Sequence, residues 1–244
     1  MRLTKINHYN HQHPLILKDP QEPYLCDGCK ERGLGLCYEC EHEGCNFSLH
    51  EECANASQST YHPFLNDCNL NFHMKAPQDG KRYCDACGKD ILGYVYQCNH
   101  KRPFDLHPCC VKLQRTLSAD GVTIHLKEKL PSKCLKCGSK EIAKRVTGWC
   151  YVSSCGKYCY HVACIKEMIL ESWMKQQENK TGEPSCLALQ RLNTSQEVAT
   201  QSESSNKAAK LWKMTKTVIL LIISAIFGDP TSLIFALAQH LFSN

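Results

Sequence analysis

Residues 26–53 read CDGCKERGLGLCYECEHEGCNFSLHEEC, and this stretch decides how the chain folds. It begins with a Cys-x-x-Cys pair, Cys26 and Cys29, and ends with a His-x-x-Cys pair, His50 and Cys53. Two thiolates on a tight turn can bind one metal ion from one side, and a histidine with a cysteine can complete a tetrahedron. The stretch therefore predicts a small module built around a bound ion.

The same arrangement occurs three times along the chain. Further Cys-x-x-Cys pairs begin at Cys84 and Cys134, and further His-x-x-Cys pairs begin at His107 and His161. From the first cysteine to the histidine, the three copies span 24, 23 and 27 positions, which indicates a tandem repeat of one module. The metal ligands predicted from these pairs are Cys26, Cys29, His50, Cys53, Cys84, Cys87, His107, Cys110, Cys134, Cys137, His161 and Cys164.

The composition favours several small modules over one large domain. The 244 residues include 19 cysteines and 12 histidines, and aromatic residues make up 8%. The apolar residues before position 210 come in short runs, so each module buries too little apolar surface to fold unaided. A structural zinc ion contributes about 10–16 kcal/mol in small finger peptides near neutral pH. We therefore expect Zn²⁺ as the cofactor.

Disulfide bonds are the alternative use of so many cysteines, and the compartment decides between the two. The N-terminus, MRLTKINH, carries charge but no apolar run of a secretory signal. We therefore expect an intracellular, cytoplasmic protein that is not secreted, with its thiols reduced and free for metal. The odd cysteine count and the interleaved histidines favour metal ligation as well.

The charge and the motifs argue against two classes of function. The net charge of +5 is mild and evenly mixed along the modules, without the basic, aromatic-rich stripe of a nucleic-acid-binding domain. The sequence shows no nucleophile elbow, phosphate loop or carboxylate pair, and a zinc ion with four protein ligands has no open position for catalysis. We expect no nucleic acid partner and no small-molecule substrate.

Each module has donors left over for a second ion. If the Cys-x-x-Cys and His-x-x-Cys pairs share one ion, the middle cysteines and a preceding histidine remain; sequential pairing of the first four cysteines uses fewer residues. In the first module this interleaving predicts a second site from His13, Cys40 and Cys45, with His62 as the best fourth ligand. Cys37 competes for these places, and otherwise it is a small buried side chain or a spare thiol.

The second sites of the other modules are less complete. In the second module, Cys98 and His73 are candidates, and the missing equivalent of Cys45 is replaced by His100 or Cys109, or the second ion is absent. The remaining candidates, in the third module, are His125, Cys150 and Cys155. The isolated histidines that we expect to be solvated are His8, His11, His42 and His240.

The end of the chain differs in kind from the modules. A run of lysines precedes two apolar stretches, 217–227 and 233–242, with Asp229 and Pro230 between them. Each stretch alone is shorter than the roughly 20 residues of a membrane-spanning helix. The tail therefore predicts a helical hairpin or an interfacial anchor whose lysines face anionic lipid. A packed oligomerisation helix pair is the alternative.

The modules resemble the divergent C1 domain, a plant cysteine/histidine-rich relative of the diacylglycerol-binding zinc finger. The resemblance rests on His13-Pro14-Leu15, on the twelve residues before Cys26, and on the run CNFSLHEECA that begins at Cys45. It extends over about residues 8–170 and implies two interleaved zinc sites, two small β-sheets and a short helix per module. It confers no phorbol ester recognition, because we find no matching Pro/Gly/Gln loop.

The sequence therefore predicts zinc-stabilised β-rich modules in tandem, an α+β architecture with a polar linker and an apolar helical tail. Apolar spacing of three and four residues after His161 predicts a helix that ends near residue 177. The predicted units are modules at 8–60, 61–115 and 120–177, a disordered linker at 178–206 and the tail at 207–244.

The predicted function is binding without catalysis. The resemblance implies an interaction module in intracellular signalling, with unknown protein partners. The lysines and apolar runs of residues 207–244 add a membrane surface as a further expected contact. A ubiquitin ligase is the main rival, because the donors from Cys134 to Cys164 match the first six of a plant-homeodomain-type finger. A thiol-disulfide oxidoreductase that uses the Cys-x-x-Cys pairs is the other.

Overall fold

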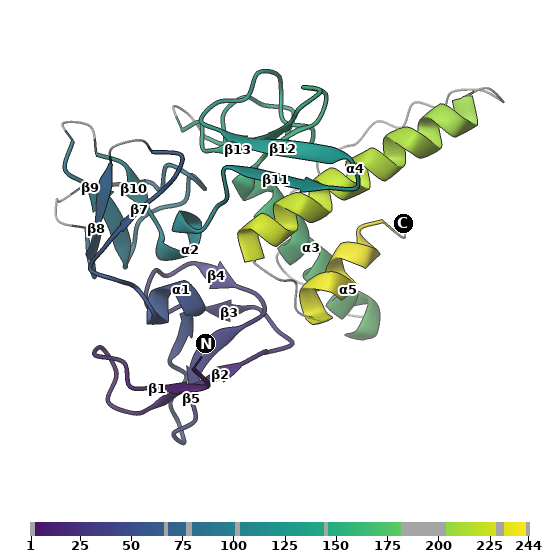
Figure 1. Cartoon of the computed structure of the whole chain (residues 1–244). Helices are drawn as coiled ribbons and strands as arrows, with labels where there is room; N and C mark the ends of the chain where they lie inside the picture. Colours follow the sequence, from purple (N-terminus) through teal and green to yellow (C-terminus); the bar gives the residue numbers. More distant parts are fainter. Residues whose placement is uncertain are drawn as a thin grey trace.

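Three four-stranded antiparallel sheets follow one another along the chain, each followed by a helix (Figure 1). The computed structural model describes residues 3–65, 68–76, 80–100, 103–143, 146–181, 204–227 and 232–242. Each sheet has the same plan: two adjacent strands, a long loop that carries the Cys-x-x-Cys pair, and two more adjacent strands. This confirms the prediction of small β-rich modules in tandem.

The elements have the following bounds. The first module contains β1 (Lys5–Ile6), β2 (Leu15–Lys18), β3 (Tyr24–Leu25), β4 (Arg32–Gly33), β5 (Cys37–Cys40), β6 (Ser48–His50) and α1 (Glu51–Ala54). The second contains β7 (Ser59–Tyr61), β8 (Asn69–His73), β9 (Val95–Cys98), β10 (Asp105–Leu106) and α2 (Pro108–Val111). The third contains β11 (Thr116–Ala119), β12 (Val122–Lys127), β13 (Cys150–Ser153), β14 (Cys159–His161) and α3 (Val162–Thr181). The tail forms α4 (Ser204–Phe227) and α5 (Ser232–His240).

The register of the central strand pair is the same in all three sheets. Leu15 pairs with Cys40 in the first sheet, and the equivalent pairs are Leu70 with Cys98 and Ile124 with Ser153. Because strand side chains alternate between two faces, each equivalent pair presents the same face to the core. A buried tyrosine stands two residues before the second partner in every sheet: Tyr38, Tyr96 and Tyr151.

The described residues add detail to the predicted modules. Each sheet begins earlier than residues 8, 61 and 120, because the short edge strands β1, β7 and β11 pair with the strand that follows them. A second small sheet, β3–β4, forms in the first module. In the described parts of the other two modules, isolated bridges Tyr83–Asp90 and Ala143–Val146 stand at the corresponding loop.

Successive modules dock through the turn of the Cys-x-x-Cys pair. The backbone N–H of Tyr94, just before β9, donates to the carbonyl of Gly28 in the first module at 2.9 Å. One module later, the N–H of Trp149, just before β13, donates to the carbonyl of Ala86 at 2.9 Å. The backbones approach closely, since a Cβ on Gly93 would lie 2.0 Å from the oxygen of Gly28.

The third module has a large residue at the same place in its turn. Lys136 stands where Gly28 and Ala86 stand in the docked turns. Its ammonium group pairs with Glu171 of α3 at 2.7 Å, and it is exposed. The turn of the third module therefore contacts α3 through its side chain, whereas the turns of the first two modules accept a backbone N–H of the next module.

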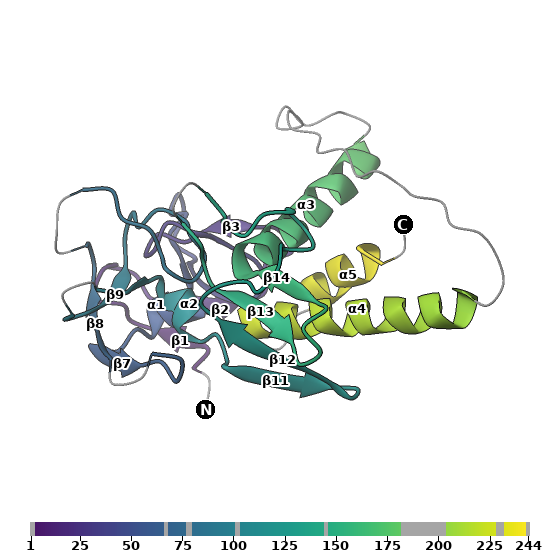
Figure 2. The same cartoon turned by 90° about the horizontal axis from the view of Figure 1, so that it is seen from above.

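The tail helices α4 and α5 pack against the third module. Figures 1 and 2 show α4 running beside β11 and β12, with α3 and α5 adjacent to it, and inter-residue contacts join these elements. Spacings of three and four residues place its apolar side chains on one face. The buried members of this face are Val218, Ile219, Leu221, Ile222, Ile223, Ala225 and Ile226. The hydroxyl of Ser172 in α3 donates to the carbonyl of Leu237 in α5 at 3.2 Å.

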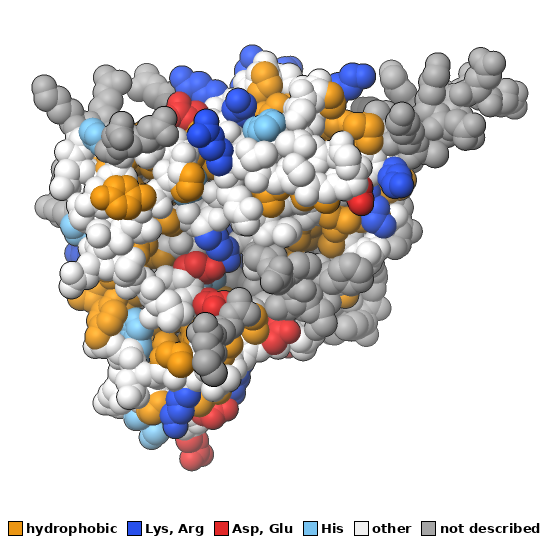
Figure 3. Space-filling view, in the orientation of Figure 1, with side chains coloured by type: hydrophobic (Ala, Val, Ile, Leu, Met, Phe, Trp, Pro, Cys, Tyr) orange, Lys and Arg blue, Asp and Glu red, His pale blue; other side chains and the backbone are white. Residues whose placement is uncertain are grey.

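The membrane prediction for the tail stays untested. Among the described residues, no helix has both the length and the apolar character needed to cross a bilayer. Most of the predicted linker and the segment around Asp229 and Pro230 lie outside the described residues; α3 extends to Thr181 and α4 begins at Ser204. Side chains of both charges are spread over the face shown in Figure 3.

The docking geometry predicts that Gly93→Ala separates the first two modules. A methyl group at this position meets a backbone oxygen that cannot move aside without breaking the Tyr94–Gly28 hydrogen bond. We expect faster limited proteolysis between residues 54 and 70 and a lower urea midpoint. Leu92→Ala is the neighbouring control, because that side chain is 68% exposed. Equal protease resistance of the two variants would contradict the docking.

The packing of the tail predicts that Ile222→Ala destabilises the unit formed by the third sheet and α3–α5. Ile222 is fully buried, and removing a buried side chain of this size costs about 2–5 kcal/mol. All three tryptophans, Trp149, Trp173 and Trp212, belong to this unit, so urea unfolding followed by tryptophan fluorescence reports on it. A tail that merely hung beside the module would give no change.

Candidate metal centres

The Cys-x-x-Cys pair of each module lies on a turn whose geometry is the same in all three modules. The carbonyl of the first cysteine accepts the N–H of the residue four positions later, at 2.9, 2.7 and 2.8 Å in the three modules. That later residue has a positive φ angle of 64°, 67° or 69°. The residues are Lys30, Gly88 and Gly138. Because glycine adopts this conformation freely, two of the three turns use it.

The last strand of each sheet brings the histidine to this turn. The residue after the first cysteine donates its N–H to a carbonyl of that strand, in the pairs Asp27–Ser48, Asp85–Asp105 and Leu135–Cys159, at 2.7, 2.8 and 3.0 Å. The strand then ends at or just before the histidine and a helix begins, which carries the final cysteine one helical turn further on. Local hydrogen bonds therefore fix both halves of each cluster.

Four donor atoms converge in each of the three modules. Their pairwise separations are all within 4.8 Å. The groups are Cys26, Cys29, His50 and Cys53; Cys84, Cys87, His107 and Cys110; and Cys134, Cys137, His161 and Cys164. These are the sets that the paired spacings predict, and whether they bind metal stays a prediction. The histidines are 7%, 0% and 0% exposed, so solvent does not reach them.

The donor separations fit a tetrahedral ion. Histidine Nδ1 lies 3.3, 3.4 and 3.5 Å from the sulfur of Cys29, Cys87 and Cys137. With Zn–S near 2.3 Å and Zn–N near 2.05 Å, tetrahedral angles give an S···N separation of about 3.6 Å. The rings are oriented for this: Nε2 of His107 and His161 lies 3.2 and 3.3 Å from a backbone carbonyl, which places the proton there and leaves Nδ1 free.

In the third cluster, contacts between two thiols shift their pKa values in opposite directions. Hydrogen bonds, of which that from Cys164 is the largest, lower the pKa of Cys134 to about 3. The same contact, together with burial, raises the pKa of Cys164 well above its usual range. A bound cation would favour the deprotonated form of both thiols, since cysteines bind metals as thiolates.

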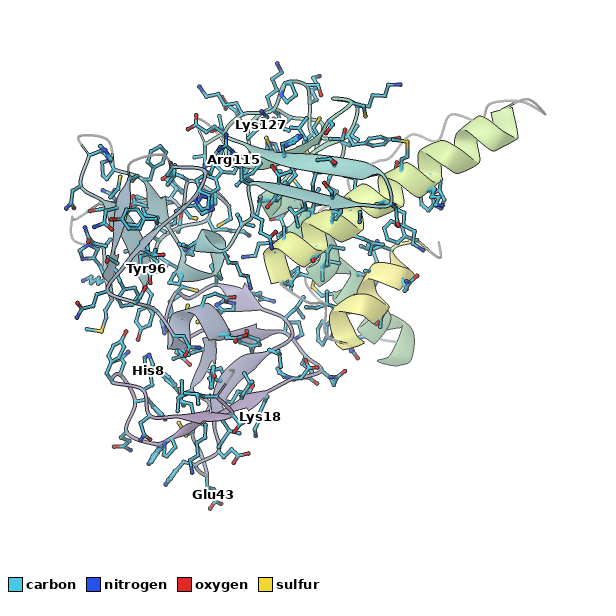
Figure 4. All side chains as sticks on the ribbon, viewed as in Figure 1. His8, Lys18, Glu43, Tyr96, Arg115 and Lys127 are labelled. Atoms are coloured by element: carbon cyan, nitrogen blue, oxygen red, sulfur yellow. The ribbon has the colours of Figure 1, made fainter. Side chains whose placement is uncertain are left out.

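The first module holds a second cluster at its far end. His11 Nε2 lies 3.5 Å from the sulfur of Cys45, and His13 Nδ1 lies 3.8 Å from the sulfur of Cys40. All four donors lie within 4.8 Å of one another. The loop between the two cysteines ends the molecule on this side, where Figure 4 labels Glu43 at its tip.

A comparison with known families places the first module. A family model described as C1 domain matches residues 9–54. This segment is a C1-type module. Both of its clusters lie within the matched range, and the Cys/His pattern is that of a C1-like zinc finger. Searches of curated proteins and of solved structures gave no match.

His11 rather than His62 completes the second cluster of the C1-type module. We expected His11 to be solvated, but its ring stacks on Phe47 with centroids 4.3 Å apart, which holds it at the cluster. The signal that could have identified it is the His-x-His spacing with His13. His62 is buried in the second module, where its Nε2 lies 2.8 Å from the carbonyl of Leu113 and its Nδ1 accepts the N–H of Phe64. Both ring nitrogens are thus used elsewhere.

Two other histidines of the first module were predicted to be solvated. His8 is buried, with its ring centroid 6.4 Å from that of Tyr94, and Figure 4 shows it on the side of the first module that faces the second. His42 is exposed and stacks on His13. Cys37 lies outside both clusters, buried opposite His50 in the sheet.

In the second module the structure brings Cys98 together with Cys68 and His100. His73 does not join them. It pairs with Val95 at the other end of β8, three positions along the strand from the Leu70–Cys98 pair, or about 10 Å away. The sequence around Cys68 contains no metal-binding motif, so we did not predict it as a ligand. Its partners come close to it only through the pairing of β8 with β9.

In the third module the predicted second donors stay apart. Cys150 is buried with its sulfur 3.4 Å from the carbonyl of Lys127, Cys155 is exposed, and His125 lies 3.0 Å from the hydroxyl of Ser154. Ser153 occupies the place of Cys40 and Cys98, and its hydroxyl accepts the N–H of Tyr158 at 3.1 Å. In the described part of this module, a hydrogen-bonded turn therefore stands where the others gather donors.

A buried charge cluster joins all three modules. Lys166 of α3 reaches Glu31 of the first module at 3.7 Å, with side chains 11% and 15% exposed. Burial lowers the pKa of Lys166, but the nearby Cys109 and Cys110 thiols, with other acidic groups, raise it well above its usual value. Cys109, which we considered as a second-site donor, is instead buried near Cys110 and Cys29, one from each neighbouring cluster, and interactions with these two thiols lower its pKa.

This arrangement predicts that Lys166→Ala weakens the association of the modules. Removing one partner of a buried ion pair leaves the other uncompensated and costs about 3–5 kcal/mol. Lys18→Ala is the matched control, because its pair with Glu41 is 39% and 57% exposed and should contribute little. Urea denaturation of the two variants compares them. Equal midpoints would show that Lys166 does not hold the junction together.

Proposed function

We propose that this protein is a non-enzymatic, intracellular zinc-binding protein whose three C1-like modules form one rigid surface for protein partners. The single observation that carries the proposal is the repeated cluster of three cysteines and one histidine, closed by four protein donors in every module. Sites of this kind stabilise a fold, whereas catalytic zinc sites keep a position open for water. The C1-type match of residues 9–54 supports a role in signalling by binding.

Zinc is the metal that the donors favour. Three thiolates and one imidazole in tetrahedral spacing suit Zn²⁺, while Ca²⁺ and Mg²⁺ prefer oxygen ligands. A protein partner is favoured over a membrane because the apolar side chains that an anchor would use, such as Ile222 and Ile223, are buried against the third module. Membrane contact through residues 207–244 stays a prediction of the sequence.

The proposal predicts at least three tightly bound zinc ions per full chain, and a fold that depends on them. Elemental analysis measures the zinc. A chelator should convert the far-UV circular dichroism spectrum to that of an unfolded chain and abolish the protease resistance of residues 3–177. The reason is that the sheets are too small to be stable alone. Intact structure after complete zinc removal would contradict the proposal.

A pair of histidine variants makes this test specific. His107→Ala should lose about one zinc ion, because a site with one ligand removed binds far more weakly. His125→Ala should lose none, because His125 lies outside every cluster of the described residues. Equal losses in the two variants would mean that the clusters are not the binding sites.

The rival activities are tested on the same zinc-loaded chain. Self-ubiquitination in a purified reaction would identify a ligase, and reduction of a disulfide substrate would identify an oxidoreductase. We expect neither. Binding to the proposed class of partner is measured by crosslinking in cell extract, with wild type and Gly93→Ala compared: loss on separating the modules supports a joint surface, and unchanged capture argues against it.

A further inference from the structure

The second module carries a group of three donors that differs from every other cluster. Cys68, Cys98 and His100 lie with their donor atoms within 4.8 Å of one another. His100 Nδ1 is 3.3 Å from the sulfur of Cys98, which is within the range of the closed clusters. The backbone N–H of Phe104 donates to the same sulfur at 3.1 Å and stabilises it as a thiolate.

The strand frame shows that this group occupies a defined position. Cys98 pairs with Leu70 as Cys40 pairs with Leu15 in the first module. Cys68 stands two residues before Leu70, as His13 stands two residues before Leu15. The N–H of Cys98 donates to Phe104 at 3.2 Å, and that of Cys40 to Phe47 at 3.0 Å. The frame is the same, while the donor types and their number have changed.

Exposure sets the group apart from the buried clusters. The two sulfur-bearing residues are 2% and 1% exposed, but His100 is exposed to solvent. Two buried thiolates would therefore bind the ion on the protein side, and an incoming ligand would approach it from the solvent side, next to the His100 imidazole. Among the described residues, no fourth cysteine, histidine or carboxylate joins the group.

We propose that Cys68, Cys98 and His100 bind an exchangeable zinc ion that keeps one coordination position open to a small nitrogen or sulfur ligand. The three ligands that the described residues supply leave such a position, which solvent or an incoming donor fills. A competing ligand can enter there and displace the protein donors one by one, so this ion leaves before those in the closed clusters. The inference rests on the proposed function, in which the closed clusters bind zinc.

The first experiment counts the ions that leave quickly. The zinc-loaded full chain is mixed with a chromophoric chelator, and the zinc released is followed over time. We expect an early phase of about one equivalent from the three-donor site, separate from slow release by the four-donor sites. Cys68→Ser should lack the early phase, whereas Cys155→Ser, which changes an exposed cysteine outside the clusters, should keep it.

The second experiment tests the open position directly. Co²⁺ replaces zinc in the full chain, and imidazole is added while the visible absorption of the metal is recorded. Wild type should change its spectrum as imidazole fills the free position, and Cys68→Ser should not. A four-donor site offers imidazole no place, so the closed clusters contribute no change.

A restoring variant separates loss of the ligand from loss of the fold. Cys68→His introduces the donor type that His13 provides in the equivalent position of the first module, and it should retain the early zinc phase. If wild type, Cys68→Ser and Cys68→His all release zinc alike, the inference is wrong while the proposed function stands. If the chain binds no zinc at all, the proposed function fails first.

Discussion

The whole structure depends on gathering three thiols and one imidazole at the point where the last strand of each sheet passes into a helix. The strands are two to six residues long, and many of the buried side chains beside them are cysteines. What fixes each module is the turn at the Cys-x-x-Cys pair, tied by backbone hydrogen bonds to the strand that carries the histidine. The donors of each module meet because the same turn and the same strand-to-helix junction recur in all three modules.

The same turn also joins the modules. Its middle residue is Gly28 in the first module and Ala86 in the second, and each carbonyl accepts an N–H from the residue before the third strand of the next module. Small side chains permit this approach. The third module has Lys136 there, paired with Glu171, and the long helices α3 and α4 take over the packing. The same turn thus serves both the internal folding of a module and its contact with the next one.

Charge explains why the three modules meet around Lys166. With zinc bound, each cluster of three thiolates and one neutral imidazole would carry one net negative charge. The buried Lys166 ammonium, which lies near Cys87, Cys109 and Cys110 and pairs with Glu31, would offset part of that charge. The second set of donors varies where the first does not: four in the first module, three in the second, and in the third a serine whose hydroxyl bonds to the backbone.

The sequence by itself determined the repeat, the four donors of each primary cluster and the class of fold, because those donors lie in short motifs on local turns and strands. Only the tertiary structure decided the second clusters. His11 enters through stacking on Phe47, Cys68 meets Cys98 across a strand pair, and His62, His73 and His125 are directed elsewhere by hydrogen bonds or strand register. It also decided the place of the tail, whose apolar stripe fits a lipid surface and a protein surface equally well. Apolar periodicity predicts that one face of a helix is buried. The surface against which that face packs depends on the shape of the neighbouring sheet, which periodicity does not contain.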